Sequence, residues 1–209
     1  MPRIAATIAD DLLSIGAVVL RPDDPFTWAS GIQSPIYCDN RLTMAHPAVR
    51  TRIRDSFAER MESRGWKPDV IAGTATAGIP HAAWLADLLG LPMVYVRGSA
   101  KEHGKGNQIE GVVKPGQRVV LVEDLISTGG SSIAAADALR DAGADVIGVA
   151  AIFSYVIPGA HERFDAAALP LFTLTNVDTL LPRALAVGTL DEAGADAVRR
   201  FRDGLAVGD

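Results

Sequence analysis

The chain has 209 residues, of which 48% are hydrophobic and 22% are charged, a composition typical of a globular enzyme. Its formal net charge of -5 at pH 7 argues against a broad nucleic-acid-binding face, which needs clustered Lys and Arg. The one cysteine, Cys38, excludes an intrachain disulfide and favours a reducing, cytoplasmic setting. The longest apolar run, residues 146–153, is too short to cross a membrane, so we expect neither nucleic acid nor a membrane as a partner.

The N-terminal third is predicted to contain two helices separated by short extended segments. Apolar residues recur at helical spacing in the first segment, at Ile4, Ile8, Leu12 and Ile15. Asp10 and Asp11 interrupt this apolar pattern, so the segment is unlike a signal peptide. Two extended segments follow, "AVVL" and "SPIYCD", and a second helix is predicted after Pro47.

The middle of the chain alternates between predicted strands and helices. Short runs of apolar, largely β-branched residues lie at 69–73, 92–96, 118–124 and 145–153. They do not alternate with polar residues, so we expect burial on both faces, as in parallel strands. Helical patterns between them end near Gly90 and Gly143, as helix C-termini do. This order predicts an α/β domain with a parallel sheet, and a T-x-x-E capping box from Thr189 to Glu192 predicts one more helix.

The stretch "VVLVEDLISTGGSS" (119–132) carries the strongest chemical signal. Glu123 and Asp124 fall at the carboxyl end of a predicted strand, where α/β sheets bind ligands. A Gly-rich loop then leads to a helix predicted to start near Ser131, an arrangement that points backbone N–H groups at a phosphate. Hydroxyl donors are added by Ser127, Thr128 and Ser131. Carboxylates repel phosphate but suit hydroxyls, so a phosphorylated ribose is the expected ligand. The alternative is a purely structural, capped strand-loop-helix.

Two other glycine-containing stretches do not fit nucleotide-binding motifs. Residues 73–80 have the spacing of an ATP-binding P-loop, but Ile79 and Pro80 stand where Lys and Ser or Thr are needed. Residues 104–111 begin as G-x-G but have a displaced third glycine. The four histidines show no paired-ligand spacing, so we expect no metal site made by the protein alone.

Structural interpretations are preferred for three other residues. His81 is predicted to be a satisfied histidine at a helix start, and Trp84 a core residue. Arg163 is predicted to lie in a surface connection.

The motif at 119–132 resembles the PRPP (phosphoribosyl pyrophosphate) motif of type I phosphoribosyltransferases. Two further segments, "FTWASGIQSPIYCDNR" (26–41) and "RGSAKEHGKGNQIEG" (97–111), resemble the orotate phosphoribosyltransferase family. The resemblance implies a single domain over 1–209 with a central, mostly parallel sheet flanked by helices. It also implies a small N-terminal hood, formed mainly by about 17–45 with the N-terminal helix. The implied activity is Mg-dependent transfer of ribose 5-phosphate from PRPP to orotate, giving orotidine 5'-monophosphate and pyrophosphate in de novo pyrimidine biosynthesis.

The resemblance also implies roles for individual residues. Lys101 and Asp124 are implied as catalytic. The PRPP-binding residues it implies are Arg97, Lys101, His103, Glu123, Asp124, Leu125, Ile126, Ser127, Thr128, Gly129, Gly130 and Ser131. Those implied to bind orotate are Ser127, Tyr37, Cys38 and Tyr155. Residues 73–78 would touch pyrophosphate. Some family members carry basic side chains where this chain has Ala29, Ala77, Gly98 and Tyr155. Which side chains bind the orotate carboxylate is therefore left open.

The chemistry of the reaction agrees with these roles. Orotate is already an anionic nucleophile, so the main requirement is to stabilise the pyrophosphate leaving group. Lys101, helped by Arg97, His103 and a Mg²⁺ ion bound mainly through PRPP, suits that role. The glycine-rich segment 97–111 is expected to be a lid that orders when substrate binds. The resemblance implies that this lid reaches the neighbouring active site of a homodimer.

Two rival functions share part of the signal. A purine phosphoribosyltransferase would keep the motif at 119–132 but not the hood or the lid. A PRPP-sensing regulator would need a nucleic-acid-binding surface, and this acidic chain shows no basic module.

Overall fold

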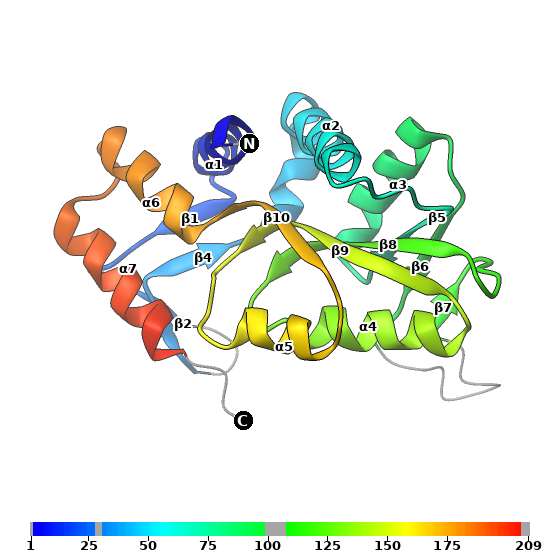
Figure 1. Cartoon of the computed structure of the whole chain (residues 1–209). Helices are drawn as coiled ribbons and strands as arrows, with labels where there is room; N and C mark the ends of the chain where they lie inside the picture. The colour runs from blue at the N-terminus through cyan, green and yellow to red at the C-terminus, as the bar shows by residue number, and fades with distance from the viewer. Residues whose placement is uncertain (1, 28–30, 99–107, 206–209) are drawn as a thin grey trace.

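The computed structural model describes residues 2–27, 31–98 and 108–205. Its centre is a six-stranded sheet with strand order β10-β9-β8-β5-β6-β7 (Figure 1). All neighbouring strands pair in parallel except the edge pair β6 and β7, so the predicted, mostly parallel sheet is confirmed. The strands are β5 (Val70–Thr74), β6 (Met93–Val96), β7 (Ile109–Glu110), β8 (Arg118–Ile126), β9 (Asp145–Ser154) and β10 (Leu171–Asn176).

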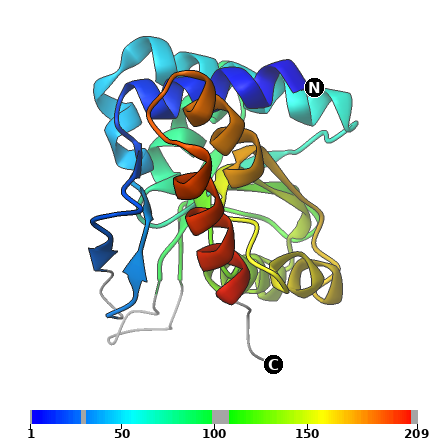
Figure 2. The ribbon, with the colours of Figure 1, turned by 90° about the vertical axis from the view of Figure 1, so that its left-hand side faces the viewer.

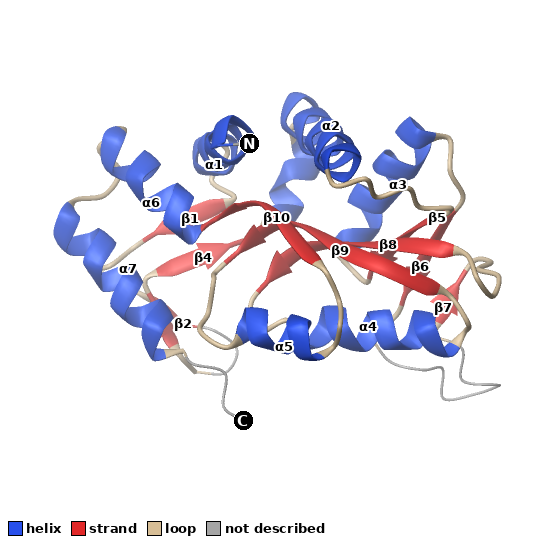
Figure 3. Cartoon of the chain, in the orientation of Figure 1, coloured by secondary structure: helices blue, strands red, loops and turns tan. Residues whose placement is uncertain are grey.

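Helices cover both faces of this sheet, as Figure 3 shows in blue on either side of the red strands. One face carries α1 (Pro2–Ser14), α2 (Pro47–Ser63), α3 (Gly78–Leu89) and α6 (Val177–Ala186). The other face carries α4 (Gly130–Asp141) and α5 (Ala160–Ala166). Gly90 ends α3 in the left-handed conformation, with φ of 63°, as the sequence predicted. None of the helices in the described ranges is long and apolar enough to span a bilayer.

The apolar strands fill two separate cores because successive side chains point to opposite faces. In β8, Val120 and Val122 pack under the larger helix layer, whereas Val119 and Leu121 pack against α4 and α5. All four are fully buried. Burying a side chain of this size contributes about 1.5–3 kcal/mol, which explains why these strands carry no polar alternation.

The hood is a separate set of short strands beside the sheet, seen on the left of Figure 2. It contains two antiparallel pairs, β1 (Val18–Leu20) with β4 (Ile36–Cys38) and β2 (Phe26–Thr27) with β3 (Gln33–Ser34). A 3-10 helix, η1 (Asn40–Ala45), then leads the chain from the hood into α2. These elements fall within the span predicted for the hood, about 17–45.

The C-terminal end differs from the sequence prediction at one cap. Asp191, not Thr189, is the N-cap of α7 (Glu192–Gly204), because its side chain accepts a 2.8 Å hydrogen bond from the Gly194 N–H. The Thr189 hydroxyl instead donates to the Ala184 carbonyl at the end of α6, so the predicted capping box is wrong.

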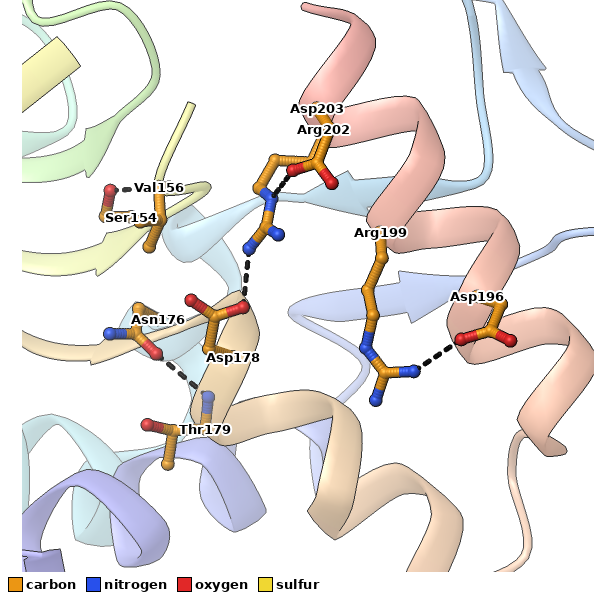
Figure 4. Close-up of polar contacts among 9 residues, drawn as sticks. All are labelled: Ser154, Val156, Asn176, Asp178, Thr179, Asp196, Arg199, Arg202 and Asp203. Carbon is orange, nitrogen blue, oxygen red and sulfur yellow. Dashed lines mark hydrogen bonds and ion pairs between the residues drawn. The ribbon is translucent and has the colours of Figure 1, made fainter. Parts of the chain in front are cut away.

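Polar side chains attach α7 to α6 (Figure 4). Asn176 caps α6 by accepting a 2.9 Å hydrogen bond from the Thr179 N–H. Arg202 of α7 reaches Asp178 in the first turn of α6 and also bonds its neighbour Asp203. The ion pair between Arg202 and Asp178 thus joins the last helix to the start of α6.

The antiparallel edge pair fixes both ends of the predicted lid. The Arg97 N–H donates to the Gln108 carbonyl at 2.8 Å, and Val96 pairs with Ile109. Ile109 and Glu110 therefore belong to the sheet and not to a free loop, as the prediction of a lid over 97–111 had assumed. The Arg97 Nη1 group lies 3.7 Å from Glu110 Oε1.

Candidate active site

The carboxylates predicted from the motif lie near the end of β8, which runs two residues further than the sequence indicated. Leu125 and Ile126 continue the strand and pair with β9. The Ile126 side chain is 1% exposed and packs in the core, so only its main chain could take part in PRPP binding. The loop proper is thus confined to Ser127, Thr128 and Gly129.

Glu123 and Asp124 form a coupled acidic pair. Glu123 is buried and accepts hydrogen bonds from the Asp124 N–H at 3.0 Å and from the Ser132 hydroxyl at 3.1 Å. Burial, helped by the neighbouring Asp124, raises the pKa of Glu123 to about 8. Burial also raises the pKa of Asp124, which is less deeply buried. We therefore expect Glu123 to hold the proton at neutral pH when no ligand is bound.

The loop after β8 has the geometry of an anion site. Gly129 has φ of +81°, and a Cβ there would lie 2.4 Å from the Phe164 ring, so both backbone and space require glycine. Helix α4 begins at Gly130 with no hydrogen bond from a capping side chain. Its first N–H groups therefore remain available to an oxygen-rich ligand.

Helix α5 supports this loop from outside. Phe164 packs against Gly129, and the Arg163 Nη1 group donates to the Thr128 carbonyl at 3.3 Å. The Arg163 guanidinium lies 3.7 Å from the position that a Cβ on Gly130 would take. Arg163 is indeed on the surface, but it lies on a helix and contacts the loop, a role that the sequence analysis missed.

A second loop, residues 75–77, follows the neighbouring strand β5 and lies beside the start of α4, where both line the same cavity. It joins β5 to α3, and its Ala75–Thr76 peptide bond is cis. The Thr74 hydroxyl donates to the Val122 carbonyl at 3.0 Å, and a Cβ on Gly78 would lie 2.5 Å from the same oxygen. This close packing brings the loop predicted to touch pyrophosphate up to the acidic strand.

Segments distant in sequence together line a cavity of about 380 Å³. Its walls are Cys38, Asp39, Arg41, Ala75, Thr76, Ala77, Glu123, Asp124, Leu125 and Ser131. The predicted residues Cys38, Glu123, Asp124, Leu125 and Ser131 are thus brought together. A smaller neighbouring cavity of about 90 Å³ is lined by Arg97, Gly98, Thr74, Ala75 and Ser131, among others, which places Arg97 beside the same loops.

Asp39 and Arg41 line the cavity but were not among the predicted site residues. Asp39 caps η1, and Arg41 donates to its carboxylate from Nε at 2.6 Å and from Nη2 at 2.8 Å. Both residues lie in the segment 26–41 that carries the family resemblance, which is the signal that could have found them.

The two tyrosines predicted to bind orotate do not line this cavity. Tyr37 lies next to Cys38 on β4, so its side chain is on the opposite face of the strand and is 39% exposed. Its ring packs against Phe26, with the ring centroids 5.4 Å apart. Tyr155 is 5% exposed and packs edge-on against Phe153 in the core, where burial raises the pKa of its phenol. Their roles toward orotate stay predictions.

Three predicted positions lie outside the described residues. Lys101 and His103 belong to the segment 99–107, and Ala29 to 28–30.

A buried polar chain links the hood to the acidic strand. The Asn40 Nδ2 group donates to the Asp124 carbonyl at 2.7 Å, and the Thr43 hydroxyl donates to the Asn40 carbonyl at 2.6 Å. His81 Nε2 lies 3.2 Å from the same hydroxyl. Because that hydroxyl has one proton and gives it to Asn40, His81 Nε2 must carry a proton and donate. Burial lowers the pKa of His81 to about 4, so His81 is a neutral, satisfied histidine, as predicted.

Comparison with known proteins gives one consistent result. A family model described as phosphoribosyl transferase domain matches residues 44–177. Orotate phosphoribosyltransferase of Enterococcus faecalis is 54% identical over 97% of this chain and 96% of its own. The crystal structure of orotate phosphoribosyltransferase from Aeropyrum pernix matches 88% of this chain and 99% of its own, at 29% identity and a TM-score of 0.77. The crystal structure of Mycobacterium tuberculosis orotate phosphoribosyltransferase in complex with PRPP matches 85% of this chain and 98% of its own, at 28% identity and a TM-score of 0.67.

Proposed function

The chain belongs to the orotate phosphoribosyltransferase family, and from this premise we propose that it transfers ribose 5-phosphate from PRPP to orotate, forming orotidine 5'-monophosphate and pyrophosphate. We assign this reaction to de novo pyrimidine biosynthesis and expect it to take place in the cytoplasm. The observation that carries the proposal is the cavity in which the hood residue Cys38 meets Glu123 and Asp124 of β8. A base held by the hood would there lie next to a ribose held by the carboxylates.

We assign the parts of PRPP to the parts of the site. The uncapped start of α4 and the loop from Ser127 to Ser131 suit the 5-phosphate. Glu123 and Asp124 suit the ribose hydroxyls, since carboxylates accept hydrogen bonds from them. The M. tuberculosis relative was crystallised with PRPP, which supports PRPP as the ligand here.

The reaction exchanges one bond at the anomeric carbon for another. The N1 lone pair of orotate forms the new bond to C1 of the ribose, and the bond from C1 to the pyrophosphate oxygen breaks, so pyrophosphate leaves with the electron pair. N1 of orotate also loses its proton in this exchange, and water or the departing pyrophosphate, which is a base, takes it, so no strong base from the protein is needed. Arg97 lines the smaller neighbouring cavity, and its buried Nη1 group makes no hydrogen bond in the described part of the chain, although it lies 3.7 Å from Glu110 Oε1. Its proposed role is to offset the negative charge that develops on the leaving pyrophosphate. Lys101 and His103 are proposed to act with it.

The site also suits Mg²⁺. Proteins commonly hold this ion through one or two carboxylates together with substrate phosphates, and Glu123 and Asp124 are donors of that kind. Mg²⁺ bound in this way would offset negative charge on the pyrophosphate. The chain's own role would be to hold the two carboxylates beside the ribose. The hydrogen bonds that Glu123 accepts serve this role.

We further propose that the enzyme is a homodimer in which the lid of one subunit reaches the site of the other. The support for this arrangement is the family resemblance of the segment 97–111.

A spectrophotometric assay tests the proposed reaction. Orotate consumption with PRPP and Mg²⁺ is measured against hypoxanthine, xanthine, adenine and uracil as alternative bases. Turnover of orotate well above the others supports the proposal. Preference for a purine would identify the enzyme as a purine phosphoribosyltransferase, and PRPP binding without turnover of any base would favour a regulator.

A further inference from the structure

The cavity beside Asp124 is lined by several carboxylates and one cation. Among the described residues on its walls, Asp39, Glu123 and Asp124 are acidic, and Arg41 alone is basic. The proposed substrate, orotate, differs from uracil by a carboxylate on C6, the atom next to the reacting N1. That carboxylate must therefore enter close to the ribose and to Asp124, where it needs a positive partner.

Arg41 is held in a defined orientation at this place. The Asp39 carboxylate accepts hydrogen bonds from the Arg41 backbone N–H at 3.1 Å, from Nε at 2.6 Å and from Nη2 at 2.8 Å. The bond from the Arg41 backbone N–H is also the N-cap of η1, so both side chains are held at the start of this 3-10 helix. The guanidinium is therefore pre-positioned along one edge, which reduces the entropy that a ligand would have to remove.

The other edge of the guanidinium is free to bind a ligand. Across the described residues, no hydrogen bond is made by the Arg41 Nη1 group, and the side chain is 59% exposed. Arg41 and Asp124 line the same cavity, which places the guanidinium in the space beside the proposed ribose position. The neighbouring Asp39 raises the pKa of Arg41, so the guanidinium stays charged. A planar carboxylate fits the remaining pair of Nη donors as a two-point contact.

We propose that Arg41 binds the C6 carboxylate of orotate and thereby sets the preference for orotate over uracil. This inference rests on the proposed function and names the substrate contact that the resemblance leaves open. Asp39 acts as a positioning residue, because it touches Arg41 and holds its orientation.

Product binding provides a sharp test, because orotidine 5'-monophosphate and uridine 5'-monophosphate differ only in this carboxylate. Calorimetry on Arg41→Gln should show orotidine monophosphate binding weakened about 10- to 100-fold, the usual effect of losing a charge-assisted hydrogen bond. Uridine monophosphate binding should change less than threefold. Arg41→Lys, which keeps the charge, should recover part of the loss. In steady-state assays the KM for orotate should rise while the KM for PRPP stays within about twofold.

Arg21→Gln is the matched control. Arg21 is also a hood arginine, but its guanidinium stacks on the Phe26 ring at 4.9 Å and does not line this cavity. The Arg21→Gln substitution should leave the affinities for orotidine monophosphate and uridine monophosphate unchanged. Equal loss of both monophosphates in folded Arg41→Gln, checked by circular dichroism, would overturn the proposal, as would unchanged binding of orotidine monophosphate. Failure of the wild-type chain to turn over orotate would instead refute the proposed function.

Discussion

Asn40 of the hood donates a 2.7 Å hydrogen bond from Nδ2 to the main-chain carbonyl of Asp124, 84 positions away in the sequence. This bond joins the hood to the carboxylate strand at the point where both border the cavity. Asn40 is 1% exposed, so no water can take its place without a rearrangement. This amide adds a directed polar contact to the apolar packing of Val18, Ile36 and Cys38, which also holds the hood against the main core.

Replacing Asn40 should therefore affect both stability and orotate binding. Asn40→Ala leaves the buried Asp124 carbonyl without a donor and should lower the free energy of unfolding by about 1–3 kcal/mol. The KM for orotate should rise more than the KM for PRPP, because the hood is released and the phosphate loop is not. Urea unfolding and steady-state kinetics measure the two effects. Gln33→Ala, which removes an exposed hydrogen bond within the hood, is the control and should change neither.

Arg163 should influence PRPP and not orotate, because it contacts the phosphate loop from α5. We expect Arg163→Met to raise the KM for PRPP about three- to tenfold, a modest effect because the side chain is exposed. Arg163→Lys should recover part of it, and kcat should change little. His161→Ala, an exposed position on the same helix, serves as the control. A PRPP KM unchanged in Arg163→Met would show that the loop needs no support from this arginine.

The pH dependence of stability should report on Glu123. Its folded-state pKa of about 8 lies above the ordinary value of 4.5, so the folded protein binds a proton that the unfolded chain releases over this interval. Stability should then fall as pH rises from 4.5 to 8, at no more than about 1.4 kcal/mol per pH unit. His81, whose pKa is lowered from 6.5 to about 4, has the opposite effect between those two values.

The useful window is thus the upper part of the range from pH 6.5 to 8, where His81 is neutral in the folded state and increasingly neutral in the unfolded chain. Guanidinium unfolding of the ligand-free protein should show decreasing stability across it, and Glu123→Gln should flatten the slope. A wild-type slope that persists in Glu123→Gln would assign the titration to another group.

Gly148 of β9 should tolerate no side chain. A Cβ there would lie 2.2 Å from Cη2 of Trp66, whose ring packs against Phe172 at 5.2 Å between centroids. Gly148→Ala should lower the free energy of unfolding by about 1–3 kcal/mol, as overpacking of a core does. Gly204→Ala is the matched control, since nothing lies within 4 Å of its Cβ position in α7. Equal stability of the two variants by thermal unfolding would contradict the expectation.

Subunit mixing tests the proposed shared site. Lys101→Ala and Asp124→Asn homodimers should each be inactive, because every site has either a defective lid or a defective carboxylate pair. A mixed dimer has one site with both defects and one site with neither. Random re-association places half of the protein in mixed dimers, so about a quarter of wild-type activity should return. Proven exchange without recovery would mean that the lid acts within its own subunit.

The sequence predicted those features that depend on local chemistry. The strand at 118–124, its acidic end and the following loop were all recognisable, because an apolar run, two adjacent acids and a glycine-rich turn are each local patterns. The left-handed cap at Gly90 was predictable for the same reason.

The features that were missed depend on packing between distant segments. Arg163 reaches the loop only because α5 folds back across 35 positions of the chain. Two capping patterns overlap around 189–194. Asp191 makes the cap bond, whereas the Thr189 hydroxyl is engaged by the Ala184 carbonyl at the end of α6, a contact that no local pattern indicates. The two-residue strand β7 gains its identity from pairing with β6 and has no signal of its own.

The hydrogen bond between the Arg97 N–H and the Gln108 carbonyl has a consequence for how the length of the chain between these residues can vary. Since β6 and β7 hold these residues together, the chain between them leaves and returns at one place on the sheet edge. The cost of closing such a connection rises only with the logarithm of its length, by about 0.6 kcal/mol for each doubling. By this scaling, an insertion that doubles the length of the connection should lower the free energy of unfolding by only about 0.6 kcal/mol, so the paired edge of the sheet tolerates a longer connection at little cost in stability.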